Sequence, residues 1–403
     1  MSKLLIIGNG FDLTCGLRSS YKDFFLWQHN NSNAFATYYM KETGDHSYAK
    51  KESGGTIFTY PSSIESKAFT EELTVWDMYF ISLKRCYKYW CDIEKAISDS
   101  LLGQDSFWKK TLRNIYAVIR KYNSGSNLEN NLSVFERLIW RNIFDKNITL
   151  PESSFGVHKT QLEFKEEEFY TLLLDQLELF ENKFRKYISQ QVEAHADYSS
   201  NTLTLTKELL SFKNNETATY SVMNFNYTDP FIWFDENAGV KFIRDNVHGT
   251  ITSDYSIFGI DSEVKNIDSS LQQIHHLDPA YLFTKQRRRI VKMAEGKESP
   301  RVTNNQYSEL VFYGHSLNEQ DYSYFHTLFD LCDLYGSELK LLFYYKEYGE
   351  TAGNNKRIRE TRITEVSALL GRYGETFSNK SHGRKLIDKL FNERRLIFKS
   401  ISR

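Results

Sequence analysis

Short apolar runs at intervals along the chain predict a buried parallel sheet. Residues 4–7 form a four-residue aliphatic run that ends at Gly8, which is typical of a central parallel strand. Later runs of β-branched or aromatic residues, several ending in Gly or Asn, predict strands at 219–224, 256–259, 310–314 and 339–345. We therefore expect a sheet of about five strands, with any ligand outside their carboxyl ends.

The middle of the chain has helical periodicity instead. Between residues 74 and 97 the apolar positions recur at gaps of four and three, which predicts one amphipathic helix with Cys86 in the core. Similar stripes cover 107–119 and 169–187, a further helix is expected at 134–144, and the tail from about residue 356 is helical in pattern. Residues 29–67 are polar without sustained periodicity, so we expect a surface excursion there.

These patterns predict an α/β fold in which a Rossmann-like parallel sheet is flanked by helices. We expect a discontinuous nucleotide-binding core from residues 1–27 and 215–348. A mostly helical insertion, residues 28–214 with the polar loop at 29–67, would follow the first β-α unit. Residues 349–403 would form C-terminal helices that pack on the core.

Charge and cysteine content exclude several classes of protein. The 403 residues carry 51 Lys plus Arg and 52 Asp plus Glu, so the net charge of −1 gives no global attraction to nucleic acid or anionic membranes. The first apolar run is too short for a signal peptide, and no run approaches the ~18 residues of a membrane helix, so we expect a cytoplasmic protein. The four cysteines lack zinc-site spacing, and adjacent His275 and His276 cannot easily face one ion, so we predict no metal.

The first candidate site is the turn Gly8-Asn9-Gly10-Phe11-Asp12 after the first strand. Two glycines there would let the backbone approach a diphosphate, beside the free N–H groups of a helix N-terminus. The dinucleotide fingerprint G-x-G-x-x-G is not met, because Leu13 stands at the third glycine position. Two interpretations stay open: a phosphate cradle, or a tight turn that needs glycine only for its geometry.

Two further candidates follow later strands. Asn224 and Asn226 alternate at a strand end, so we expect one to face a cleft and the other to cap backbone groups. His248, in Val-His-Gly, could act as a general base because an ordinary histidine has a pKa of ~6.5, although such a residue is more often structural.

The fourth candidate is Gly314-His315-Ser316-Leu317, with Asp321 close behind it. A buried strand that ends in this way can present N–H groups and a hydroxyl to ribose or phosphate. Ser316 and His248 do not indicate an esterase, because the nucleophile elbow needs a glycine where Asn318 stands.

Two groups of charged residues lie outside these motifs, and for both the sequence favours a structural role. The basic run from Lys285 to Lys292 could meet nucleic-acid phosphates, but its spacing favours a solvated helix face. Lys285 could alternatively reach a bound diphosphate. Asp92 and Glu94 flank Ile93 at the border of a buried helical face, where they would pair with a basic neighbour or orient a cleft residue.

In chain order these pieces resemble the bacteriophage abortive infection AbiH family. The likeness rests on the opening Leu-Ile-Ile-Gly-Asn-Gly-Phe-Asp-Leu with Gly-Leu and Ser-Tyr-x-Asp-Phe (5–24), Phe-Asn-Tyr-Thr (225–228), Val-His-Gly (247–249), Phe-x-Gly-His-Ser-Leu (312–317) with Asp321, and Trp-x-Asp-Ile-Glu (90–94). The resemblance implies a role in phage defence, and a phage-derived trigger as a partner.

The same order of elements also resembles, more distantly, the sirtuin core, which implies an NAD site. Gly8 and Gly10 match the diphosphate turn, Asn226 the asparagine at the nicotinamide ribose and His248 the base. The last turn, Gly314-His315-Ser316-Leu317, matches the adenosine side with His315 in place of threonine. Thr228 stands where sirtuins usually have aspartate, and the absent zinc module argues against protein deacetylation.

This resemblance implies cleavage of NAD to nicotinamide and ADP-ribose. The leaving group is already cationic, so a base and a positioning residue suffice, and these roles fall to His248 and Asn226. Tyr21 and Asp23 would line the nicotinamide side. The residues expected to bind the nucleotide are Gly8, Asn9, Gly10, Asp12, Tyr21, Asp23, Gly314, His315, Ser316, Leu317 and Asp321.

Three functions from different classes remain open on this sequence. The first is an NAD-consuming defence effector, and the second is a module that senses a nucleotide without turnover. The third is a nucleic-acid effector, which the balanced charge disfavours. Spacing alone does not separate NAD from NADP, because no acid or arginine can be assigned to the ribose 2′ position.

Overall fold

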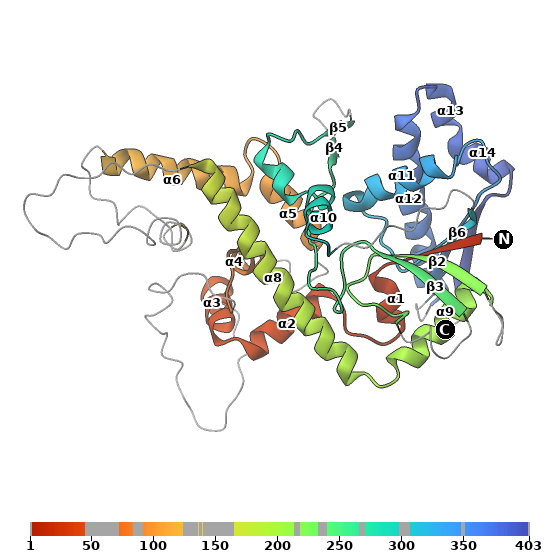
Figure 1. Cartoon of the computed structure of the whole chain (residues 1–403), viewed down its shortest axis with the longest axis horizontal. Helices are drawn as coiled ribbons and strands as arrows, with labels where there is room; N and C mark the ends of the chain where they lie inside the picture. The colour runs from red at the N-terminus through yellow and green to blue at the C-terminus, as the bar shows by residue number, and fades with distance from the viewer. Residues whose placement is uncertain are drawn as a thin grey trace, which may run out of the picture.

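A computed structural model of the chain describes residues 2–44, 72–83, 92–123, 136, 139, 165–212, 218–232, 240–265, 271–297, 307–347 and 351–401. Its centre is a six-stranded sheet in the order β3-β2-β1-β6-β7-β8 (Figure 1). Every neighbouring pair in this sheet is parallel. The strands are β1 (Ser2–Ile7), β2 (Ala218–Asn224), β3 (Val240–Asn246), β6 (Tyr307–Tyr313), β7 (Lys340–Lys346) and β8 (Leu396–Ile401).

This strand order is that of the Rossmann fold and therefore contains a topological switch point. The first three strands of the sheet run outward from β1 in one direction, and the last three run outward from β6 in the other. Ile7 pairs with Asn224 on one side and with Tyr313 on the other, so the carboxyl ends of β1, β2 and β6 are level. A ligand crevice is expected between β1 and β6.

Helices cover both faces of the sheet. Leu4 and Ile6 pack on one face, whereas Leu5 and Ile7 pack on the other, as the alternation of side chains along a strand requires. The first face is covered by α11 (Tyr322–Leu331), α12 (Ala352–Thr376) and α14 (Leu386–Asn392), with α13 (Lys380–Arg384) beside α12. The second is covered by α1 (Asn9–Thr14) and α9 (Tyr198–Leu210).

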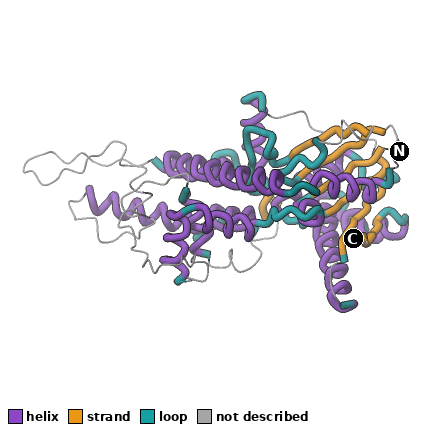
Figure 2. The backbone as a smooth tube through the Cα atoms, turned by 90° about the horizontal axis from the view of Figure 1, so that it is seen from below, coloured by secondary structure: helices purple, strands orange, loops and turns teal. Residues whose placement is uncertain are grey.

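A separate helical body extends from one end of the sheet (Figure 2). Its aromatic core includes Trp76, Trp108 and Phe180, all fully buried. The long helix α8 crosses the molecule and leads into α9 at the sheet (Figure 1). The body contains α2 (Tyr21–Asn31), α3 (Asn33–Thr43), α4 (Val75–Ser82), α5 (Ile93–Leu101), α6 (Phe107–Asn123) and α8 (Glu166–Ala194).

Smaller elements lie between β3 and β6. They are the antiparallel pair β4 (Glu263–Lys265) and β5 (Leu271–Gln273), a 3-10 turn at Pro279–Phe283, and α10 (Lys285–Ala294). Over the part of the chain that the structure describes, no helix combines the length and apolar character needed to span a bilayer.

The parallel α/β prediction is confirmed, but two strands of the central sheet were missed and one predicted strand was wrong. Residues 256–259 form only an isolated bridge, between Ser256 and Gly249, and Phe258 joins the core of the helical body instead. The missed strands are β3 and β8, the two edges of the sheet. Since β8 lies within 349–403, that segment is not purely helical.

Two helix predictions also need correction. Residues 74–97 do not form one helix, because α4 ends at Ser82 and Asp92 caps a new helix, α5, by accepting from Lys95 N at 2.9 Å. The polar segment 29–67 contains α3, which is capped by Ser32 and buries Phe35. Cys86, most of the expected helix 134–144 and residues 45–67 lie outside the described residues.

The space around two glycines predicts opposite effects when each is replaced by alanine. Gly314 has φ +71°, and an added Cβ would lie 2.2 Å from Phe11 N, so Gly314→Ala should lower the free energy of unfolding by at least about 1–3 kcal/mol. Gly371, in α12, has open space at its Cβ position, so Gly371→Ala should raise it by about 0.5–1 kcal/mol. Urea denaturation of both variants measures this; equal effects would contradict the packing described.

Candidate functional site

A cavity of about 910 Å³ opens at the carboxyl ends of the strands around the switch point. This volume is in the range of small-molecule sites, about 300–1,000 Å³. Nearly all residues expected from the sequence line it: Gly8, Asn9, Gly10, Asp12, Tyr21, Asn226, His248, Gly314, His315, Ser316 and Asp321. The fold thus brings together motifs from the ends of β1, β2, β3 and β6.

Two expected residues, Asp23 and Leu317, are not among the residues that line the cavity. Asp23 lies in the first turn of α2, where its carboxylate accepts from Ser20 Oγ at 2.5 Å. Leu317 has φ +50° and is buried in the core under the sheet. Both therefore have local structural roles.

The glycines of the first turn serve close packing between two strand ends. Gly8 N donates to Tyr313 O at 3.2 Å, and Gly10 N donates to Gly314 O at 2.7 Å. A Cβ at Gly8 would lie 2.6 Å from His315 Cα, and one at Gly10 would lie 2.7 Å from Gly314 Cα. These two N–H groups are thus already paired, which favours the geometric interpretation of the turn over a phosphate cradle.

Asp12 forms a buried hydrogen-bonded cluster in the cavity wall. Its carboxylate accepts from Tyr198 Oη at 2.6 Å, Thr228 Oγ1 at 2.8 Å and Asn226 Nδ2 at 3.3 Å. Burial raises the pKa of Asp12 to about 7, although the hydrogen bonds from Tyr198 and Thr228 oppose that rise. A carboxyl with a pKa near neutrality can accept or return a proton at cellular pH.

The two asparagines at the end of β2 divide their roles as expected. Asn224 caps backbone groups: its Nδ2 donates to Thr228 O at 2.7 Å and its Oδ1 accepts from Asn226 N at 3.0 Å. Asn226 lines the cavity, and its Oδ1 is buried without a hydrogen-bond partner among the described residues. Because unpaired buried acceptors are costly, this oxygen is suited to a hydroxyl or amide donor from a ligand.

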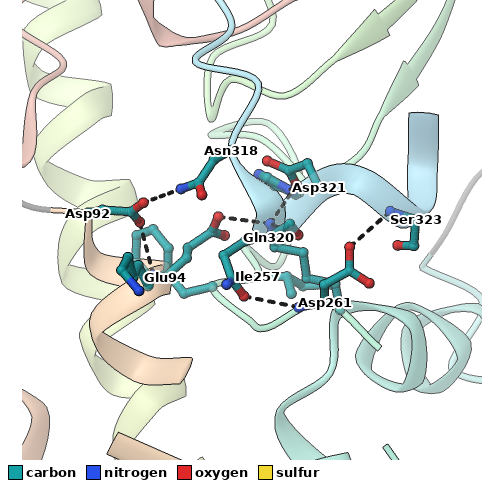
Figure 3. Close-up of polar contacts among 12 residues, drawn as sticks. Asp92, Glu94, Ile257, Asp261, Asn318, Gln320, Asp321 and Ser323 are labelled. Carbon is teal, nitrogen blue, oxygen red and sulfur yellow. Dashed lines mark hydrogen bonds and ion pairs between the residues drawn. The ribbon is translucent and has the colours of Figure 1, made fainter. Parts of the chain in front are cut away.

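A buried cluster of charges lies on the side of the cavity formed by α5 and the 3-10 turn Glu319–Asp321. Lys285 Nζ lies 2.6 Å from Asp321 Oδ1 and 2.8 Å from Glu94 Oε2. Figure 3 shows Glu94 and Asp92 reaching from α5 toward Asp321 and Asn318. The cluster therefore joins the helical body to the sheet.

The two carboxyl groups of this cluster have pKa values shifted in opposite directions. Burial raises the pKa of Glu94 to about 8, which Lys285 opposes. The pKa of Asp321 is held well below its usual range, because Lys285 and the two histidines outweigh its burial. Lys285 itself stays charged: burial lowers its pKa, but the two carboxylates raise it above the ordinary value.

The sequence pattern favoured a solvent-exposed helix face for the basic run from Lys285 to Lys292. That interpretation is wrong for three of its cationic residues. Lys285, Arg288 and Arg289 are all buried on α10. Arg288 pairs with Glu181 through two nitrogens, and Arg289 Nη2 lies 2.9 Å from Asp245 Oδ1. The run holds α10 against α8 and β3, so these three cations are not presented to nucleic acid.

His248 is a weaker base than its ordinary pKa suggests. Burial, followed by the charge of Lys285, lowers its pKa to about 4, although Asp321 opposes this shift. Its Nε2 lies 3.4 Å from Asp321 Oδ1, and His315 Nε2 lies 3.4 Å from Asp321 Oδ2. Both rings are thus oriented by one carboxylate, and His248 is neutral at pH 7.

The sequence was also compared with protein families and known proteins. Residues 4–344 match the family described as bacteriophage abortive infection AbiH. The chain belongs to this family. The AbiH resemblance is therefore confirmed, and membership indicates a role in abortive infection, a defence against phage. No curated protein and no solved structure matches, so the sirtuin-like NAD-binding core stays a prediction.

The site of this AbiH-family chain includes cations that the sequence reading missed. Lys346 at the end of β7, and Arg357 and Arg362 on α12, line the same cavity. Lys346 could have been predicted as a site residue, because it comes directly after an apolar run that predicts a strand. Tyr198, the partner of Asp12, gave none, because it lies in an ordinary amphipathic helix. No group of three or more His, Cys, Asp or Glu residues in the described ranges is arranged to hold a metal.

Proposed function

We propose that the protein is an abortive-infection effector that binds NAD in this cavity and hydrolyses its nicotinamide N-glycosidic bond. The observation that carries the proposal is the pairing of Asp12 with Asn226 in the cavity wall at the β1–β6 switch point. Open α/β sheets bind nucleotides at this position. Family membership supplies the defence role.

The chemistry follows from the groups in the wall. Nicotinamide leaves the ribose as a neutral molecule and takes the electron pair of the broken C–N bond, so no general acid is needed. A water forms the new C–O bond, and Asp12 accepts its proton, since a pKa of about 7 matches that task. Asn226 Oδ1 would accept from a ribose hydroxyl and hold the sugar in place.

In this proposal His248 positions the ligand and Asp12 acts as the base. A pKa of about 4 makes His248 neutral but poorly basic at pH 7. Asp321 beside Nε2 favours the tautomer with the proton on that atom, which leaves Nδ1 as an acceptor.

The second candidate function is nucleotide sensing without turnover. It is favoured by the weak basicity of His248. It is also favoured by Thr228, whose hydroxyl already donates a hydrogen bond to Asp12. A sensor would be stabilised by its ligand and would form no product.

Chromatography of purified protein incubated with NAD tests the proposal. The wild type should form nicotinamide and ADP-ribose in equal amounts, and Asn226→Ala should lower the rate about 100-fold, because the ribose loses its acceptor. Asn182→Ala, an exposed position on α8, is the matched control and should keep the wild-type rate.

The outcomes separate the two functions. Stabilisation by NAD without nicotinamide release, in the presence of extract from phage-infected cells, would establish the sensor. Full activity of Asn226→Ala would contradict the site assigned here.

A further inference from the structure

Three cationic side chains line the cavity from β7 and α12. Arg362 is already paired: its Nη1 donates to His315 O at 2.7 Å and lies 3.0 Å from Glu365 Oε2. The side chains of Lys346 and Arg357 form no hydrogen bond or ion pair with any residue in the described ranges. Two cations that face a ligand-sized cavity without a protein partner indicate an anionic ligand group.

The glycine turn does not offer an equivalent anion site. The N–H groups of Gly8 and Gly10 donate to backbone carbonyls at the end of β6. The helix that begins at this turn, α1, has six residues and carries the Asp12 carboxylate in its first turn. A phosphate at the N-terminus of α1 would lie near the Asp12 carboxylate. The glycine turn itself supplies no unpaired cation to offset the repulsion between the two.

Four further carboxyl groups line the cavity from elements other than β7 and α12. Asp12, Asp92, Glu94 and Asp321 all line the cavity, and Lys285 neutralises only part of their charge. These carboxyl groups come from α1, from the start of α5 and from the turn after β6, whereas the two unpaired cations come from β7 and α12. A molecule with a cationic ring at one end and phosphates further along fits this arrangement in one orientation only.

We propose that Lys346 and Arg357 form the phosphate subsite of the cavity, and that its ligands are nucleotides with at least two phosphates. The diphosphate lies against α12 and the end of β7, while the nicotinamide ribose lies at Asp12 and Asn226. Arg357 contributes a planar fork that matches phosphate oxygens, and Lys346 contributes a point charge. This proposal rests on the proposed function for the orientation of the ligand.

Calorimetric titration of the full chain with ADP-ribose and with nicotinamide riboside tests the subsite. The double variant Lys346→Ala/Arg357→Ala should bind ADP-ribose at least about 30-fold more weakly, because it loses two charge-assisted phosphate contacts. Its affinity for nicotinamide riboside, which has no phosphate, should change less than about twofold. Raising the salt concentration should weaken ADP-ribose binding by the wild type more than by the variant.

The control is Lys356→Ala/Arg359→Ala, which removes the same amount of charge from α12, the helix that carries Arg357. These side chains are exposed, do not line the cavity and pair with Glu360 and Glu347. Affinity of the control for ADP-ribose should equal that of the wild type. An equal loss in both double variants would show a general electrostatic effect and overturn the subsite.

The subsite and the proposed hydrolysis can fail separately. Selective loss of ADP-ribose binding without cleavage of NAD by the wild type would sustain the subsite and reject the hydrolase. Cleavage of NAD with an unchanged KM in Lys346→Ala/Arg357→Ala would sustain the hydrolase and reject the subsite. Absence of ADP-ribose binding by the wild type would also reject the subsite.

Discussion

Replacing Asp12 by asparagine should lower kcat for NAD cleavage by about 10²–10⁴-fold, because the site loses its general base while the side chain keeps its size. The carboxylate accepts from Tyr198, Thr228 and Asn226, and it is 1 % exposed, so no water can take its place easily. Affinity for NAD should change far less than kcat. Initial rates and titration calorimetry on the same preparation measure the two effects.

The pH profile gives an independent readout of Asp12. The base must be ionised, so kcat/KM should rise with pH and level off above its pKa of about 7. Tyr198→Phe removes a hydrogen bond that lowers this pKa, so the midpoint should move to higher pH. Asp254→Asn, at an exposed position, should leave both rate and profile unchanged. A midpoint that does not move in Tyr198→Phe would assign the base elsewhere.

Lys285→Met should destabilise the protein by about 3–5 kcal/mol at pH 7, because it leaves buried carboxyl groups without their cation. Lys285 Nζ contacts both Asp321 and Glu94, and it is 2 % exposed. Urea denaturation of wild type and variant gives this difference. Lys292→Met on the same helix is the control, and its longer contacts with Glu178 and Glu295 predict a change of at most about 1 kcal/mol.

The destabilisation should depend on pH in a defined direction. The pKa of Asp321 is lowered in the folded protein, so its stabilising contribution is present above the unfolded value of about 3.9. That contribution is lost as pH falls through the folded pKa. The difference between wild type and Lys285→Met should therefore narrow below about pH 4, and a difference that is constant from pH 7 to pH 3 would contradict the ion pair.

The sequence predicts the centre of the sheet better than its edges, and the reason is burial. β1, β6 and β7 are buried on both faces, so their apolar runs are continuous. β3 alternates buried Val240 and Phe242 with more exposed Lys241 and Ile243, and β8 buries only its last residue, Ile401. Edge strands need less apolar sequence, and their signal is correspondingly weak.

The site was predictable where its residues follow strand ends and not where they depend on tertiary contacts. Asn226, His248 and Gly314 follow strands, and the parallel sheet brings them to one edge. The basic run was predicted wrongly. Its spacing is typical of a solvent-exposed helix, but Arg288 and Lys285 form ion pairs with carboxylates of helices that are distant in sequence. Only packing creates such partners. The same holds for the pKa of Asp12, which depends on burial in the folded protein and on hydrogen bonds from Tyr198 and Thr228.

A crystal structure of Asp12→Asn with NAD tests the central claim most directly, because the variant should bind NAD without cleaving it. We expect a hydroxyl of the nicotinamide ribose within about 2.6–3.2 Å of Asn226 Oδ1 and the diphosphate beside Lys346 and Arg357. NAD bound outside this cavity, or bound in the reverse orientation with its phosphates at Asn226, would contradict it.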